Sequence, residues 1–337
     1  MKEIKIQSSD AGQRLDKLLS RHLGNAPRSF LYKMLRKKNI TLNGKKASGN
    51  EMLSCGDTVR IFFSDETYEK FSAGSHTAAV PQHIPALDAS CIIYEDEHIM
   101  AVNKPSGVLS QKSRPEDVSV NEQILQYLLQ THKITAEQAA RVRPSVCNRL
   151  DRNTSGLLLA GKTLQGLQGL SEILRSRELH KYYLCLVHGK MEGTQRMDGY
   201  LWKDEKRNRV RILSEQERLS GTYPDAKPVL TEYRALQSDG EITLLEVLLV
   251  TGRPHQIRAH LASAGHPILG DSKYMPAGQD RKIEKTYGIK DQMLHSRRMV
   301  FPGMKGALSS LSYLTLEAPV PELFARILEE HGMKEQI

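Results

Sequence analysis

Asp151 is the first residue of this sequence whose surroundings suggest chemistry. It lies in the segment NRLDRNTSGLLLAGKT, which begins at Asn148, between an arginine and a polar turn and just before an apolar run. An aspartate here is either a reactive carboxylate or a turn residue that accepts hydrogen bonds from backbone N–H groups two or three residues further on. Taken alone, the D-x-x-T-S-G pattern favours the turn.

A tyrosine pair is the second candidate. In the segment KYYLCLVHG the residue pattern predicts a strand, so Tyr182 and Tyr183 point to opposite faces. A phenol beside a carboxylate can stack on a flat substrate and move a proton.

The segment TGRPHQIRAHL supplies a cation. Its spacing predicts a helix with Pro254 at the first position, and with His255 and Arg258 about one turn apart on one side. Arg258 could pair with Asp151 and keep a nucleophile or base charged at neutral pH.

Other chemistries are less well supported. His255 and His260 are separated by about 140° around a helix, unlike the i, i+4 pair of a zinc helix, so no metal site is expected. The four cysteines form no C-x-x-C pair, and we expect no disulfide. A glycoside or nucleoside hydrolase would normally need two carboxylates, and Asp151 is the acid found within a motif.

The elements that must position these residues are mixed. Strands are predicted at CIIYEDEHIMAVNKP, LHKYYLCLVHG, VLTEYRALQ and EITLLEVLLVTG, and helices at 119–129, 164–174 and 255–264. The strands outnumber the helices and are separated by turns. The pattern indicates an α+β fold with a mainly antiparallel sheet and flanking helices.

The N-terminal segment has an unusual charge. From Lys17 to Asn50 there are nine basic residues and no acidic one, which accounts for the whole net charge of +9. A helix is predicted after Pro27, and the spacing of its apolar residues leaves its basic residues free to face outward. Asn43-Gly44 predicts a tight hairpin. Like charges on a small module repel unless a polyanion neutralises them, so we expect a small α/β domain that binds the RNA backbone. The side chains expected to make these contacts are Arg28, Lys33, Arg36, Lys37 and Lys45.

The chain should therefore contain two domains. We expect an RNA-binding domain at 1–64, a linker at 65–87, where periodicity is lost, and a catalytic domain at 88–330. The N-terminus lacks the apolar core of a signal peptide and no long apolar run occurs, which favours a cytoplasmic protein without a membrane partner.

Both domains resemble known families. RLDKLL, PRSFLYKMLRKKNITLNGKK and CGDTVRI resemble the S-four RNA-binding module over about Gly12 to Ile61. From about Ala89 to Glu317 the chain resembles the RluA-type family of RNA pseudouridine synthases. The motifs occur in order: N-K-P-S-G, R-L-D-x-x-T-S-G, K-x-Y-x-x-L-V-x-G, T-G-R-x-H-Q-I-R-x-H-L and G-H-P-I-L-G-D.

The resemblance implies roles for single residues. Asp151 would be the catalytic aspartate, Tyr183 the active-site tyrosine and Arg258 the arginine that pairs with the aspartate. Arg149 would fill the stack left by a flipped nucleotide. Further RNA contacts are expected from Lys104, Arg253 and His255.

The same resemblance implies the reaction. An isomerase of this family detaches uracil from its ribose and rejoins it through carbon 5, so no cofactor is expected. Asp151 would act by attack on ribose or by a glycal route, and the sequence leaves both open. The S-four module favours large-subunit ribosomal RNA, and a monomer is expected. The alternatives are a synthase acting on transfer RNA and a non-catalytic ribosome-assembly factor.

Two positions depart from the family pattern. Asn148 stands where a histidine usually precedes R-L-D, and Pro254 stands where threonine or serine is commoner. Because Asn148 adjoins the arginine expected to replace the flipped nucleotide, we expect this departure to affect the choice of substrate more than the activity.

Overall fold

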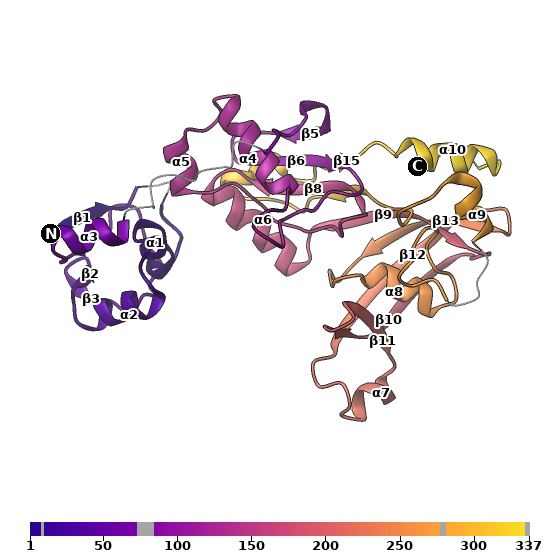
Figure 1. Cartoon of the computed structure of the whole chain (residues 1–337), viewed down its shortest axis with the longest axis horizontal. Coiled ribbons are helices and arrows are strands. Elements are labelled where there is room, and N and C mark those ends of the chain that lie inside the picture. Colours follow the sequence, from indigo (N-terminus) through magenta and orange to yellow (C-terminus); the bar gives the residue numbers. More distant parts are fainter. Residues whose placement is uncertain (8–9, 73–83, 277–280, 334–337) are drawn as a thin grey trace. The chain divides into compact units, whose positions relative to one another are not determined.

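The computed structural model describes residues 1–7, 10–72, 84–276 and 281–333 (Figure 1). By internal packing the chain divides into two units. The first comprises Met1–Leu87, Glu122–Ser145 and Gly161–Gln168, and the second comprises Asp88–Asn121, Val146–Ala160 and Gly169–Ile337. None of the described helices is long and apolar enough to cross a membrane.

The N-terminal part of the first unit is a small sheet packed on two helices. Leu15, Leu18 and Leu19 of α1 and Leu31 and Leu35 of α2 are buried in one core, because their spacing puts them on one helix face. The strands follow the order β1-β4-β2-β3. The elements are β1 (Lys2–Lys5), α1 (Leu15–His22), α2 (Arg28–Arg36), β2 (Ile40–Leu42), β3 (Lys45–Lys46), β4 (Thr58–Ile61) and α3 (Asp65–Ser72).

In this module the predicted hairpin is present, and a helix occupies part of the segment expected to be a linker. Asn43 and Gly44 both have positive φ, 50° and 73°, and join β2 to β3 as the predicted hairpin. Helix α3, by contrast, occupies the start of the segment expected to be a linker, because Tyr68 and Phe71 pack against the module's core. Residues 73–83 of that segment lie outside the described residues. The domain boundaries at 64 and 87 stay a prediction.

The second unit is built on a sheet of eleven strands. Its main path is β11-β10-β12-β13-β9-β14-β8-β6-β5, with β15 on β14 and β7 on β8. Among the described strand pairs with a defined register, β14 and β8 alone run parallel. The predicted α+β class with a mainly antiparallel sheet is confirmed. The strands are β5 (Ile92–Glu95), β6 (Ile99–Lys104), β7 (Ser145–Val146), β8 (Ser155–Gly161), β9 (His180–His188), β10 (Thr194–Asp204), β11 (Arg209–Leu213), β12 (Lys227–Ser238), β13 (Ile242–Leu249), β14 (Leu294–Val300) and β15 (Thr315–Glu317).

The three helices predicted after the N-terminal module are present, and four further α-helices among the described residues there were not predicted. The predicted helices at 119–129, 164–174 and 255–264 are α4, α6 and α8. Pro254 is not the first helical residue, since α8 begins at Gln256 and His255 is its N-cap in a left-handed conformation with φ 53°. The helical elements after α3 are η1 (Ala89–Cys91), α4 (Val120–Gln130), α5 (Ala136–Arg141), α6 (Leu164–Ser176), α7 (Glu215–Leu219), α8 (Gln256–Ser263), α9 (Lys282–Tyr287), η2 (Gly306–Leu311) and α10 (Glu322–Glu330).

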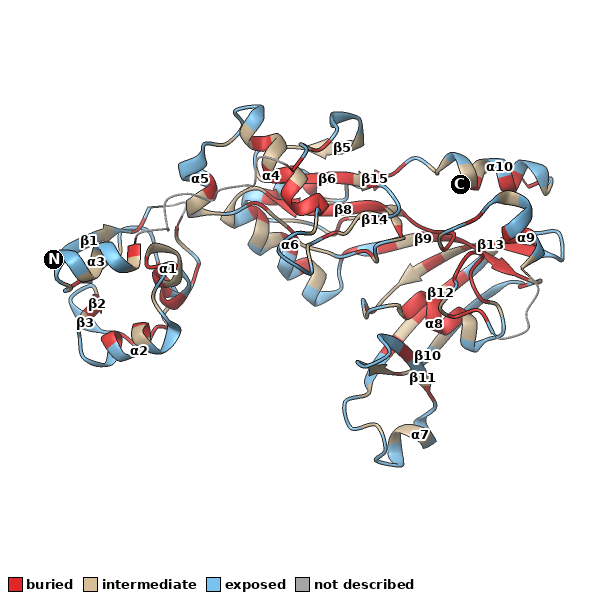
Figure 2. Ribbon diagram, viewed as in Figure 1, coloured by how far each residue is buried: buried red, intermediate tan, exposed pale blue. Residues whose placement is uncertain are grey.

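The middle strands of the sheet carry most of its buried residues (Figure 2). There Tyr183 of β9 lies opposite Ser296 of β14, which in turn lies opposite Gly156 of β8. A Cβ on Gly156 would lie 2.2 Å from the Ser296 carbonyl oxygen, so glycine is required for this close approach. This row sets Tyr183 two strands away from the loop that carries Asp151.

Candidate active site

Asp151 lies in the loop before β8, and its backbone and its side chain make different contacts. The Thr154 N–H donates to the Asp151 carbonyl at 3.1 Å and closes the turn. The Ser110 hydroxyl accepts from Leu150 N–H at 3.0 Å and donates to the Leu150 carbonyl at 2.9 Å. The turn predicted at Asp151 is therefore present, but the backbone closes it. The carboxylate remains available for other contacts.

Arg258 of α8 holds that carboxylate. Its Nη1 lies 2.8 Å from Asp151 Oδ2, while Nε and Nη2 lie 2.7 and 2.8 Å from the two oxygens of Asp271. Arg258 and Asp271 are buried, and the Asp151 side chain is 27% exposed. Burial alone would lower the pKa of Arg258, but Asp271 and Asp151 together raise it. The pairing expected between Arg258 and Asp151 is present.

His255 approaches the same carboxylate from the helix N-cap. Its Nε2 lies 3.9 Å from Asp151 Oδ2, and its Nδ1 lies 2.8 Å from the Tyr274 hydroxyl. That hydroxyl accepts the Val210 N–H at 3.0 Å. Burial lowers the pKa of His255, which favours a neutral ring at pH 7.

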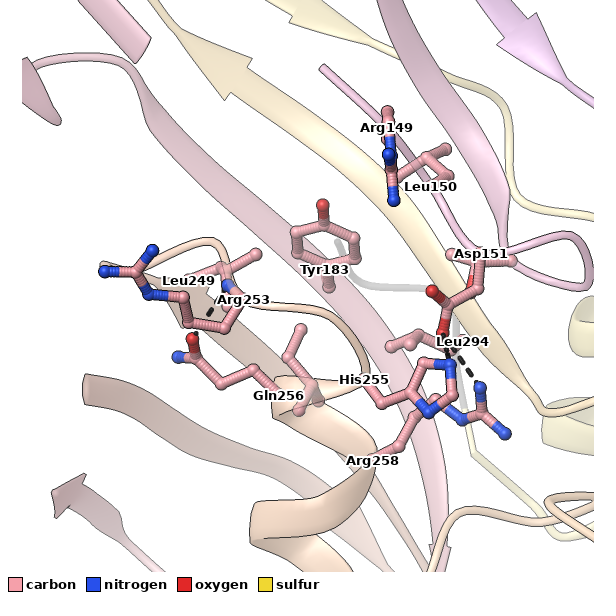
Figure 3. A pocket seen from close by; sticks show the side chains of 12 residues that line it. Arg149, Leu150, Asp151, Tyr183, Leu249, Arg253, His255, Gln256, Arg258 and Leu294 are labelled. Atoms are coloured by element: carbon pink, nitrogen blue, oxygen red, sulfur yellow. Dashed lines mark hydrogen bonds and ion pairs between the residues drawn. The ribbon is translucent and has the colours of Figure 1, made fainter. Parts of the chain in front are cut away.

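Tyr183 completes the group. Asp151, Tyr183, His255 and Arg258 line one cavity of about 60 Å³, together with Arg149 and Arg253. Figure 3 shows the phenol between Asp151 and Arg253, with its oxygen directed to the side of Arg149. Burial, and then the charge of Asp151, raise the pKa of Tyr183 to about 12.

The neighbouring tyrosine is used differently. The Tyr182 ring lies on the opposite face of β9, with the Arg298 guanidinium carbon 4.0 Å from its centre. Of the pair, Tyr183 is the one that lines the cavity with Asp151.

Two models of known protein families match the chain. The family model described as RNA pseudouridylate synthase matches residues 98–263, and the S4 domain model matches residues 13–59. The chain is 32% identical over 336 residues to "Ribosomal large subunit pseudouridine synthase C" of Escherichia coli (strain K12), covering 98% of this chain and 96% of the relative. This chain belongs to the RluA-type family of RNA pseudouridine synthases.

Two further comparisons agree. The protein of the same name from Vibrio cholerae is 32% identical to this synthase over 308 residues, 88% of each chain. The solved structure "Human RNA Pseudouridylate Synthase Domain Containing 4" superposes with a TM-score of 0.57 at 22% identity. It covers 73% of this chain and 94% of that chain, and shows a shared fold. The expected family and class, an isomerase with an S-four module, are confirmed.

The side chain of Lys104 in the synthase lies inside the protein and does not reach a surface where RNA could bind. Its side chain is fully buried, and its Nζ donates to the carbonyls of Pro105, Val108 and Arg152 at 2.8, 2.8 and 2.9 Å. Burial lowers its pKa to about 8, which leaves the ammonium protonated at pH 7. The expected phosphate contact is wrong for Lys104, because all three of its N–H donors are used inside the protein. It instead anchors the loop of Asp151.

The other expected RNA contacts have the exposure they need. Arg149 is exposed, Arg253 and His255 are half-buried, and all three line the cavity of Asp151. In the S-four module the outward orientation expected of Arg28, Lys33, Arg36 and Lys37 is confirmed, and Lys45 is exposed as well. Their contacts with RNA stay predictions.

Asn148, the departure from the family pattern, has a structural role. Its Oδ1 accepts the Leu159 N–H at 2.7 Å and its Nδ2 donates to the Leu157 carbonyl at 3.4 Å. Both partners are backbone groups of β8. Asn148 therefore ties the segment before Asp151 to the strand that follows it.

Three residues near the site were missed from the sequence. Asp271 binds Arg258, Tyr274 binds His255, and Lys181 lines an adjoining cavity. Asp271 ends the G-H-P-I-L-G-D motif and Lys181 begins K-x-Y, so a signal was present for both. Nothing local to Tyr274 predicted its contact.

Proposed function

We propose that this synthase converts specific uridines of large-subunit ribosomal RNA to pseudouridine. The observation that carries the proposal is the Asp151 carboxylate, held by a buried arginine beside Tyr183 in a cavity lined by basic side chains. The relatives named above are large-subunit ribosomal synthases, which supports this substrate over transfer RNA.

The three central residues would divide the chemistry. Asp151 attacks the ribose, or removes a proton to form a glycal, while the bond from ribose carbon 1 to uracil N1 breaks. Uracil rotates and carbon 5 forms the new bond. Carbon 5 then loses its proton and N1 gains one, so the reaction is an isomerisation that consumes no cofactor.

Arg258 and Tyr183 would prepare this step. Arg258 holds Asp151 through Nη1 while Asp271 binds its other two nitrogens, so the carboxylate is oriented before substrate binds. Tyr183 carries its proton at neutral pH, since its pKa is about 12. It would therefore stack on the uracil ring and donate a hydrogen bond.

The RNA has to present its uridine outside the stack. Flipping costs a few kcal/mol, which backbone contacts offset. Arg149 would fill the vacated stack, and Arg253 and His255 would contact the flipped nucleotide. The S-four residues Arg28, Lys33, Arg36, Lys37 and Lys45 would bind phosphates elsewhere on the RNA. We propose that the synthase acts as a monomer in the cytoplasm.

Mapping pseudouridines tests this proposal. Total RNA is compared from cells with and without the gene, and from deletion cells that carry wild type or Asp151→Asn. We expect a large-subunit position to lose pseudouridine without the gene and regain it with wild type alone. If no RNA position depends on the gene, the function is wrong. If Asp151→Asn restores the modification, the role of Asp151 is wrong, and a dependent position in transfer RNA would replace the substrate.

A further inference from the structure

Lys181 is a buried cation that the proposed chemistry does not use. It lies on β9 two residues before Tyr183, on the same face of the strand, and is only 7% exposed. Among the described residues none forms a hydrogen bond or ion pair with its ammonium group. Burial, and then the nearby Arg177, lower its pKa. A buried charge without a partner is costly, so such groups mark places where a ligand supplies the opposite charge.

The cavity beside Lys181 is lined by further cations. It measures about 600 Å³ and adjoins the smaller one, since Arg149, Asp151, Tyr183 and Arg253 line both. Arg177 also lines it. Asp151 is the one acidic residue lining it in the described part of the chain. The Arg253 Nε is buried and, within that same part, also lacks a hydrogen-bond partner.

Arg177 is held in a conformation that arginine rarely adopts. Its φ is 65°, and it directly follows α6, where the Glu178 N–H donates back to the Ile173 carbonyl at 3.1 Å. This is the C-terminal helix position at which glycine is favoured. The cation therefore occurs at a backbone position that favours another residue.

We propose that Lys181 and Arg177 form a subsite for a backbone phosphate of the RNA, adjacent to the nucleotide that enters the cavity of Asp151 and Tyr183. This inference rests on the proposed function for the identity of the ligand. A phosphate carries a full charge and several acceptor oxygens, which suits an ammonium and a guanidinium acting together. A neutral uracil ring offers carbonyl acceptors but no charge to balance two cations.

Binding measurements test the subsite without turnover. The full chain carrying Asp151→Asn is titrated with large-subunit ribosomal RNA from cells lacking the gene, at several salt concentrations. Adding Lys181→Met should weaken binding about 10- to 100-fold. The slope of log affinity against log salt is negative, and it should become less steep by roughly 0.7 to 0.9, the value for one lost phosphate contact.

Arg177→Gly is the second variant, because glycine suits its backbone and cannot disrupt folding through strain. It should weaken binding and flatten the salt slope as Lys181→Met does. His132→Gly is the matched control: His132 is exposed, lies just after α4 with φ 56°, and lines none of the cavities described above. It should leave RNA binding unchanged. Unchanged salt slopes in both Lys181→Met and Arg177→Gly would overturn the subsite.

Uncharged backbone linkages identify the phosphate that Lys181 contacts. Short RNAs containing the mapped uridine carry a single methylphosphonate at one neighbouring linkage. At one linkage the substitution should weaken binding by the Asp151→Asn chain but add little to the loss caused by Lys181→Met. Additive losses at every linkage would exclude the contact. So would a Lys181→Met chain, with Asp151 intact, whose kcat falls while KM is unchanged, since that indicates a role on uracil.

Different experimental results would contradict the phosphate subsite and the proposed function. Wild type that forms pseudouridine, while Lys181→Met and Arg177→Gly both keep the salt slope of the parent chain, would remove the subsite alone. Wild type that forms none, with a flattened slope in Lys181→Met, would remove the function and leave the phosphate subsite.

Discussion

Asp271 binds Arg258 through both of its oxygens, at 2.7 and 2.8 Å, in a place where the Asp271 side chain is wholly buried. A planar guanidinium held at two points keeps one orientation. The remaining Nη1 of Arg258 is thereby directed at Asp151. The position of the proposed catalytic carboxylate thus depends on an aspartate that does not contact it.

Asp271→Asn should reduce both stability and activity. An amide cannot accept both N–H groups or balance the charge of Arg258, and breaking a buried pair costs about 3 to 5 kcal/mol. Loss of orientation should slow isomerisation about 100-fold. Urea unfolding and single-turnover assays measure the two effects. Asp151→Asn is the control for stability, because Arg258 then keeps Asp271: it should abolish activity with little change in unfolding free energy. Equal stability losses in the two variants would contradict this account.

Tyr183→Phe separates the ring from the hydroxyl. The ring still stacks, so KM should change by less than about threefold, while kcat should fall about 10-fold because the hydrogen bond from the hydroxyl to uracil is lost. Steady-state kinetics on a short RNA measure both. Tyr182→Phe, on the opposite face of β9, should leave both values unchanged. Because the pKa of Tyr183 is about 12, its ionisation should not appear in the pH–rate profile between pH 6 and 9. An ionisation in that range that disappears in Tyr183→Phe would refute the neutral phenol.

Lys104→Met tests whether this lysine is structural. Removing its three N–H groups leaves three partly buried carbonyls without these donors, which should cost about 2 to 4 kcal/mol of unfolding free energy and lower kcat by loosening the loop of Asp151. The salt dependence of RNA binding should not change, because the ammonium does not reach solvent. A salt slope reduced by about 0.7 or more would restore the phosphate contact.

Two buried histidines should make the synthase sensitive to acid. Burial lowers the pKa of His260 and of His295 to about 4, from an ordinary value of 6.5. Between these pH values the unfolded chain binds protons that the folded chain does not, so stability falls as pH falls from 6.5 to 4. Each histidine should contribute about 2 to 3 kcal/mol to this loss.

His295→Asn measures one of these contributions. An amide can replace Nδ1 in the 2.8 Å contact with the Ser155 hydroxyl. Chemical denaturation at pH 7 and 4.5 should show a smaller loss for the variant, by about 2 kcal/mol. The exposed His132→Asn serves as control. If His295→Asn and wild type lose the same free energy, His295 is not the group that titrates.

The sequence by itself determined what depends on local order along the chain. The motifs around Asp151, Tyr183 and Arg258 indicated the family, and residue alternation separated Tyr183 from Tyr182 because strand side chains alternate between faces. Asn43-Gly44 predicted its hairpin because few other residues adopt two positive φ angles. The outward basic face of α2 followed from helical spacing in the same way.

Tertiary structure alone decided contacts between distant segments. The backbones of Gly156 and Ser296 meet because β8 and β14 pair in parallel, and nothing near either residue encodes that pairing. Lys104 looked like a surface cation, yet the loops that close over it supply three carbonyls. Helix α3 was missed because its apolar residues are few, and its packing against the module's core stabilises it. Local patterns fix which face of an element is apolar, but which groups meet across that face depends on how the whole chain packs.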